Sequence, residues 1–143
     1  MASANFFAEQ IAAAKQVFNM REQAKAAHEQ DQRAHYQAVI DHLVDHILDG
    51  WREKVANAAK RGFFKTNIFC YGEGAKFEGV NMAFLISGPR EDREYWDKRG
   101  IKGVLQQVRE AIEVPGRSKV KYWYTGARNG NVFEVIWDPK EFA

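Results

Sequence analysis

The chain has 143 residues and a formal net charge of +2, because 21 lysines and arginines nearly balance 19 aspartates and glutamates. A chain of this length is expected to form one domain with a core that needs neither disulfides nor metals. The hydrophobic content of 45% and the aromatic content of 13% exclude intrinsic disorder for the chain as a whole. The net charge is too small to indicate a class of partner.

The sequence has one cysteine, Cys70, and no Asn-x-Ser/Thr site, so nothing in it indicates a secreted protein. Residues 1–10 lack the basic and apolar segments of a signal peptide, and the longest apolar run, Met82 to Ile86, is too short to span a bilayer. We therefore expect a soluble intracellular protein, cytoplasmic or nuclear, that has no membrane partner.

A change in composition near Gly62 divides the chain. Residues 1–61 are rich in strong helix formers and form the predicted helical segment, whereas residues 62–143 have the glycines, aromatic residues and β-branched residues of a small α+β part. We expect the two parts to form one domain, from which the N-terminal helix is free to project.

The helical segment has an apolar stripe near its start that does not continue through residues 19–37. Phe7, Ile11, Ala14 and Phe18 follow at spacings of 4, 3 and 4, which places them on one side of a helix. Residues 19–37 have no wide apolar face, and the polar residues 29–31 suggest a break before a second helix over residues 32–61. No glycine or proline enforces that break, so one long helix is the alternative.

Residues 62–143 are expected to form a mostly antiparallel sheet with one packed helix, which makes the fold class α+β. No internal repeat is evident. The predicted elements are a strand at 63–71, a loop at 72–79, a short buried strand at 80–86, an irregular segment at 89–99, a helix at 101–112, and a C-terminal β-hairpin with strands at 118–125 and 132–138.

Several phrases in the last two-thirds of the chain resemble small uncharacterised proteins of large double-stranded DNA viruses. The resemblance implies no activity; it implies a viral setting, with packing in the virion as one role. The phrases are Ala59-Lys60-Arg61-Gly62, Thr66-Asn67-Ile68-Phe69, Gly100-Ile101-Lys102-Gly103-Val104-Leu105, Val120-Lys121-Tyr122-Trp123 and Val135-Ile136-Trp137.

The hairpin is a candidate nucleic-acid surface. Its first strand brings Arg117, Lys119 and Lys121 together with Trp123, and Arg128 lies in the turn. Cations beside an aromatic ring suit phosphate contact and base stacking. An ordinary solvated surface is the competing interpretation, because the cations are few and Glu134 can neutralise one of them across the strands.

Four histidines, His28, His35, His42 and His46, fall within roughly 40° of each other on a continuous helix. The pair at positions 42 and 46 has the i, i+4 spacing of metal ligands, with Asp45 or Asp49 one turn away. The pair lacks the glutamate of the H-E-x-x-H motif, so we expect a solvated histidine stripe and no bound metal.

No motif supports an enzyme. Gly72-Glu73-Gly74 followed by Gly79 does not have the spacing of a phosphate-binding loop and is expected to form ordinary turns with positive φ. Cys70 lies in an apolar strand and is expected to be buried, with a raised pKa. We expect no catalytic residues, no cofactor and no small-molecule ligand.

Two functions from different classes follow from these patterns. The first is a non-enzymatic protein-interaction or assembly module, in which Phe7, Ile11 and Phe18 contact a protein partner or a second copy of the chain. The alternative is a nucleic-acid-binding protein that uses the hairpin. A metal protein or enzyme built on the histidine stripe is the third and weakest hypothesis.

Overall fold

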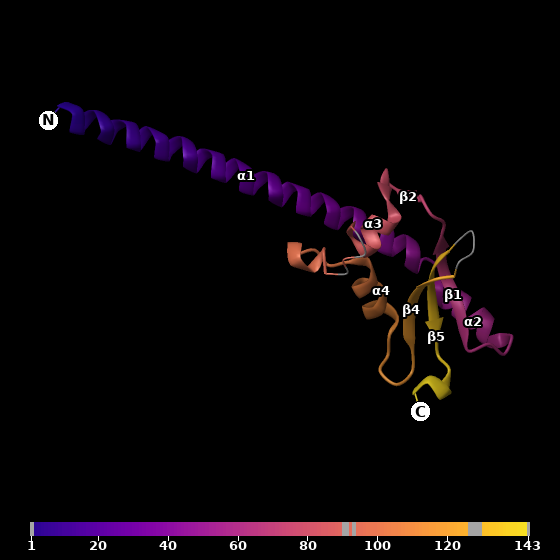
Figure 1. Cartoon of the computed structure of the whole chain (residues 1–143). Coiled ribbons are helices and arrows are strands. Elements are labelled where there is room, and N and C mark those ends of the chain that lie inside the picture. The colour runs from indigo at the N-terminus through magenta and orange to yellow at the C-terminus, as the bar shows by residue number, and fades with distance from the viewer. Residues whose placement is uncertain (1, 90–91, 93, 126–129, 143) are drawn as a thin grey trace. The chain divides into compact units, whose positions relative to one another are not determined.

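The computed structural model describes residues 2–89, 92, 94–125 and 130–142. It confirms the α+β class: two helices come first in the chain, and the strands of the described residues follow them, with two shorter helices between the third and fourth strands (Figure 1). The chain divides into two compact units, residues 1–35 and residues 36–143.

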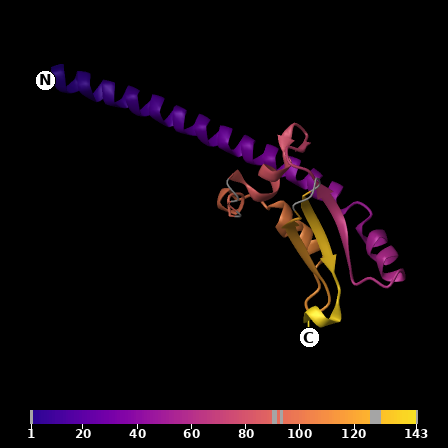
Figure 2. The same cartoon turned by 45° about the vertical axis from the view of Figure 1, so that its right-hand side comes forward.

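The first helix, α1 (Ala2–Leu48), is continuous through the segment where a break was predicted (Figures 1 and 2). The expected break at residues 29–31 is therefore wrong, because the surrounding segment, residues 19–37, is rich in Ala and Gln, which favour a helix even without burial. Gly50 separates α1 from α2 (Trp51–Lys60): its φ of 68° is a left-handed conformation that glycine adopts easily.

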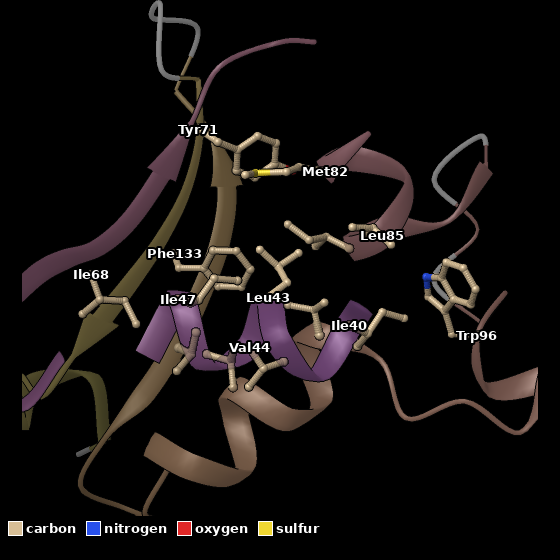
Figure 3. Close-up of a cluster of buried hydrophobic side chains, with 14 of the residues drawn as sticks. Ile40, Leu43, Val44, Ile47, Ile68, Tyr71, Met82, Leu85, Trp96 and Phe133 are labelled. Atoms are coloured by element: carbon tan, nitrogen blue, oxygen red, sulfur yellow. The ribbon is translucent and has the colours of Figure 1, made fainter. Parts of the chain in front are cut away.

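The core of residues 36–143 begins on the last turns of α1. Val39, Ile40, Leu43, Val44 and Ile47 are buried, and they follow the spacing of one helical face. In Figure 3, Leu43 and Ile47 lie beside Phe133, a fully buried residue of the sheet. This end of α1 is thus part of the core.

Three strands form the main sheet, in the order β1-β5-β4. They are β1 (Lys65–Tyr71), β4 (Lys119–Tyr124) and β5 (Asn131–Ile136), and both pairings are antiparallel, so the predicted hairpin is confirmed. Phe133 lies opposite Tyr122 on one side and Phe69 on the other. The register shifts between Asn67 and Phe69, which marks an irregularity in β1.

The predicted buried strand at residues 80–86 is wrong. Within this segment only β3 (Val80–Asn81) is extended; it forms a small hairpin with β2 (Lys76–Phe77), which lies in the segment expected to be a loop. The helix α3 (Met82–Ser87) follows, because the Asn81 side chain accepts a hydrogen bond from the Phe84 N–H at 3.3 Å and caps it. Its buried residues are Met82, Leu85 and Ile86, which have helical spacing.

The predicted helix at residues 101–112 is confirmed as α4 (Val104–Ile112), which buries Val104, Val108 and Ile112. Short 3-10 turns, η2 (Asp97–Arg99) and η3 (Pro139–Phe142), complete the described elements. Gln37 fixes the segment before α4 to α1: Lys102 N–H donates to Gln37 Oε1 at 2.8 Å, and Gln37 Nε2 donates to the Lys102 carbonyl at 3.1 Å.

Side chains cover part of each sheet edge. Lys54 Nζ donates to the Ile68 carbonyl on β1 at 2.8 Å, and Glu113 Oε2 accepts from the Val120 N–H on β4 at 3.0 Å. Charged groups placed at edge strands discourage the sheet from pairing with a second sheet. The sheet edges are therefore poor candidates for a surface that associates.

Candidate interaction surface on the N-terminal helix

Every described side chain from residue 2 to residue 35 is exposed. This segment of α1 holds most of the exposed large hydrophobic residues of the described chain. They are Phe6 (54% exposed), Phe7 (62%), Ile11 (55%), Val17 (47%), Phe18 (62%) and Met20 (62%). Single exposed apolar residues are normal on protein surfaces, but a contiguous group of this kind marks an interaction site.

The N-terminal stripe consists of Phe7, Ile11, Ala14 and Phe18. Because α1 is helical throughout, their spacings place them within about 60° of each other around the helix axis. The rings of Phe6 and Phe7 meet edge to face, with centroids 5.4 Å apart, which widens the apolar surface beyond the stripe. The structure thus brings together the three residues that the sequence predicted as interaction residues.

A second exposed row on the same segment was missed by the sequence analysis. We call it the heptad seam: its members recur at alternating spacings of three and four, with Gln10 and Asp31 as its two polar positions. The apolar members are Phe6, Ala13, Val17, Met20, Ala24, Ala27 and Ala34. A row of this period is what one helix of a coiled coil presents to another.

The heptad seam is accompanied by a repeat in the flanking residues. Glutamine recurs every seven residues at Gln16, Gln23, Gln30 and Gln37, and the pattern Ala-His-x-Gln occurs at residues 27–30 and again at 34–37. The expectation of no internal repeat is therefore wrong. The signal is in the sequence, but a search for large apolar side chains overlooks it because most seam positions are alanine.

The candidate nucleic-acid residues of the hairpin lie on β4 and in the turn before it. Lys119, Lys121 and Trp123 share one face, since alternate residues of a strand do, and the Lys121 ammonium lies 5.0 Å from the centroid of the Trp123 ring. Lys119 pairs with Glu141 at 2.9 Å, so its charge is partly neutralised. Arg117 is exposed, and Arg128 lies outside the described residues.

The histidines divide between the two units. His28 and His35 lie in the exposed segment, whereas His42 Nδ1 is 3.0 Å from Glu78 Oε1 and the His46 ring packs against Phe69 and Phe77. Among the residues that the structure describes, no group of three potential ligands is arranged to hold a metal ion. His42 and His46 instead contact the β1–β3 region.

Two further sequence expectations have clear outcomes. Cys70 is exposed, so its predicted burial is wrong. Its partner across the sheet is Val132. The register of β1 shifts before Cys70, between Asn67 and Phe69, so strict alternation along the sequence does not predict which face of the sheet Cys70 occupies. The prediction of positive φ is confirmed for Gly74 and Gly79, which have φ values of 79° and 78° in turns, but Gly72 does not have a positive φ.

Two ionisable groups have shifted pKa values for structural reasons. Burial, and then the hydrogen bond to the Tyr122 hydroxyl, raises the pKa of Tyr71 well above its ordinary value. The hydrogen bond from Lys102 lowers the pKa of the Glu110 carboxyl, and the positive charge of Lys102 adds to that effect. The two groups lie on different elements and do not form a catalytic pair.

No family model, curated protein or solved structure matches this chain. Within the described parts of the chain, none of the helices combines the length and apolar character that crossing a bilayer requires. The exposed apolar surface of residues 2–35 of α1 is the candidate site that the geometry supports best.

Proposed function

We propose that this protein is a non-enzymatic interaction or assembly module, whose N-terminal helix segment (residues 2–35) binds a protein partner or a second copy of the chain through its apolar surface. The observation that carries the proposal is the exposure of six large apolar side chains, at positions 6, 7, 11, 17, 18 and 20, on one helix. The regular seven-residue pattern around them supports the proposal, because it is the pattern of helices that pair.

The energetics favour a partner. Each large apolar side chain gains roughly 1.5–3 kcal/mol when it moves from water into a fully buried site. Six such residues on one segment represent a large free energy that only association can recover, if the segment is not covered within its own chain. A helix that bound nothing would gain more from polar residues at these positions.

The test is a pair of triple variants compared by sedimentation. Phe7→Gln/Ile11→Gln/Phe18→Gln removes the N-terminal stripe, and Ala12→Gln/Asn19→Gln/Ala26→Gln places the same side chain at helix positions outside both the stripe and the heptad seam. Glutamine is a good helix former, so both variants should keep their helix signal in circular dichroism. We expect the first variant to associate more weakly or into smaller complexes than the unaltered chain, and the second variant to associate as the unaltered chain does.

Equal association of both triple variants and the unaltered chain would contradict the proposal for these three residues. Absence of association by the unaltered chain, with itself and with any purified helical partner tested, would contradict the proposed function as a whole. The helix signal separates either result from simple unfolding of the segment.

The hairpin supports a second candidate function, binding of nucleic acid. The observation in its favour is the shared face of Lys119, Lys121 and Trp123, with Arg117 exposed nearby. Against it stands the pairing of Lys119 with Glu141. If the hairpin binds phosphates, affinity should fall steeply with salt, and Lys119→Glu/Lys121→Glu should abolish binding. No binding at low salt would remove this candidate.

The setting of the protein remains a prediction. The resemblance of its C-terminal two-thirds to viral proteins favours a role in a virus-infected cell or a virion, and an assembly module suits either place. The predicted intracellular location likewise stays a prediction.

A further inference from the structure

We propose that the occupant of the heptad seam is a second copy of the same helix, running antiparallel, in the register that places Met20 against Ala24 of the second copy. This inference rests on the proposed function and names the partner. The same register places Val17 against Ala27 and Gln10 against Ala34 of the second copy, and each of these contacts occurs twice because the pair is symmetric.

Side-chain size is the first argument for this register. In every layer from residue 10 to residue 34, one of the two facing residues is alanine: the larger residues Gln10, Val17 and Met20 each meet an alanine, and Asp31 meets Ala13. Large residues that face small ones fill the space between helices evenly. One step further out, Phe6 meets Ala38, which is also exposed on α1.

A parallel pair lacks this complementarity. It would place each seam residue against its own copy, so that Ala13, Ala24, Ala27 and Ala34 all face alanine and leave poorly filled layers. It would also place Asp31 against Asp31 of the second copy, where two carboxylates repel each other. The antiparallel register separates these carboxylates along the helix.

Asp31 also excludes the two antiparallel registers that differ from the proposed one by one heptad. A shift by one heptad in one direction places Asp31 opposite Phe6, and a shift in the other direction places it opposite Met20. Either arrangement buries a carboxylate against a large apolar side chain, which is costly without a partner charge. Of these three registers, only the proposed one gives Asp31 a small neighbour, beside which water can reach it.

The flanking residues are compatible with this arrangement. In an antiparallel pair the glutamine columns face each other, so Gln16 lies near Gln30 of the second copy and Gln23 near its own copy; amides can both donate and accept hydrogen bonds. Arg21 lies near Arg21 of the second copy, but both are exposed, where solvent screens their repulsion.

The N-terminal stripe lies next to the seam, on the side of Phe7, and the symmetry of the pair brings both copies of the stripe to one side of it. That side is an apolar face on which a second pair can pack. A complex of two or of four chains therefore fits the proposal, whereas three chains do not.

Disulfide cross-linking tests the register. In a full-length Cys70→Ser background, which removes the exposed native thiol, Gln10→Cys and Ala34→Cys are made as separate single variants. The two positions are about 36 Å apart along one helix, so they can meet only between chains in antiparallel orientation. After mixing under reducing conditions and mild oxidation, we expect the mixed 10–34 disulfide to exceed either homodisulfide at least tenfold.

Ala27→Cys mixed with Gln10→Cys is the matched control, because it reports the register shifted by one heptad and should cross-link far less. Predominant 10–10 or 34–34 disulfides would show a parallel pair and overturn this inference, while the proposed function would stand. A mass of one chain at all concentrations, together with no cross-link, would overturn self-pairing; binding of a different helical protein would then still leave the proposed function intact.

Discussion

Tyr71 and Tyr122 join the two edge strands of the sheet through a hydrogen bond between their hydroxyl groups. Tyr71 is 5% exposed, so its hydroxyl has little access to water and depends on this one partner. The Tyr122 ring also packs on Phe133, with centroids 4.8 Å apart. The pair therefore contributes both packing and a satisfied polar contact across the central strand.

We expect Tyr122→Phe to lower the free energy of unfolding by about 1–3 kcal/mol, because it leaves the buried Tyr71 hydroxyl without a partner. The double variant Tyr71→Phe/Tyr122→Phe should be less destabilised than Tyr122→Phe alone, since it removes both polar groups. Urea unfolding measures both. Tyr124→Phe is the control, because Tyr124 is 65% exposed; an equal loss in this variant would contradict the account.

The pairing of Lys102 with Glu110 predicts a dependence on pH. The pKa of Glu110 is lowered in the folded protein, so the pair stabilises the fold above the ordinary glutamate pKa of 4.5, and that contribution is lost as the pH falls through the lowered value. An NMR titration of the Glu110 carboxyl should give a midpoint below 4.5. Lys102→Met should raise the midpoint, whereas Lys140→Met should leave it unchanged; no response to Lys102→Met would contradict the assignment.

At the scale of secondary structure, strong periodicity predicted the elements well. The hairpin follows from alternation with period two, and α4 follows from apolar residues spaced three and four apart. The predictions were wrong where a helix cap or helix propensity determines the secondary structure. Asn81 converts an apolar run that fits either element into the helix α3, and helix formers carry α1 through a polar segment.

Two glycines with positive φ give a prediction at this scale. Gly50 and Gly88 both have left-handed φ values, but a Cβ on Gly50 would meet no atom within 4 Å, whereas a Cβ on Gly88 would lie 2.6 Å from the Tyr95 Cβ. Gly50→Ala should cost about 1 kcal/mol of stability through backbone conformation alone. Gly88→Ala should cost more, because its backbone conformation (φ 71°, ψ −178°) is one that essentially only glycine adopts, and overlap with Tyr95 adds to that penalty. Equal costs in urea unfolding would contradict this difference.

For the molecule as a whole, the sequence predicted a helical segment followed by an α+β part but not the division into compact units. Composition changes near Gly62, just after α2 ends, whereas the compact units divide between residues 35 and 36. That division depends on which turns of α1 contact residues far along the chain, as Gln37 contacts Lys102. Such contacts leave little trace in local sequence.

Only part of the candidate interaction surface on α1 could be predicted from the sequence. Phe7, Ile11 and Phe18 are large enough to stand out in a helical pattern. The heptad seam consists mainly of alanines, which are frequent in any helix and acquire meaning only when their seven-residue period is followed over five turns or more. A helix that is continuous from residue 2 to residue 48 makes that period visible.

The central claim is that residues 2–35 of α1 are covered by a second copy of the chain. The most direct test is the mass of the unaltered full-length protein in solution, measured by light scattering over a series of dilutions. We expect the mass of two or four chains at high concentration, falling toward one chain on dilution because the contacts are intermolecular. A mass of one chain throughout the series, with the helix signal unchanged, would contradict self-association through this helix.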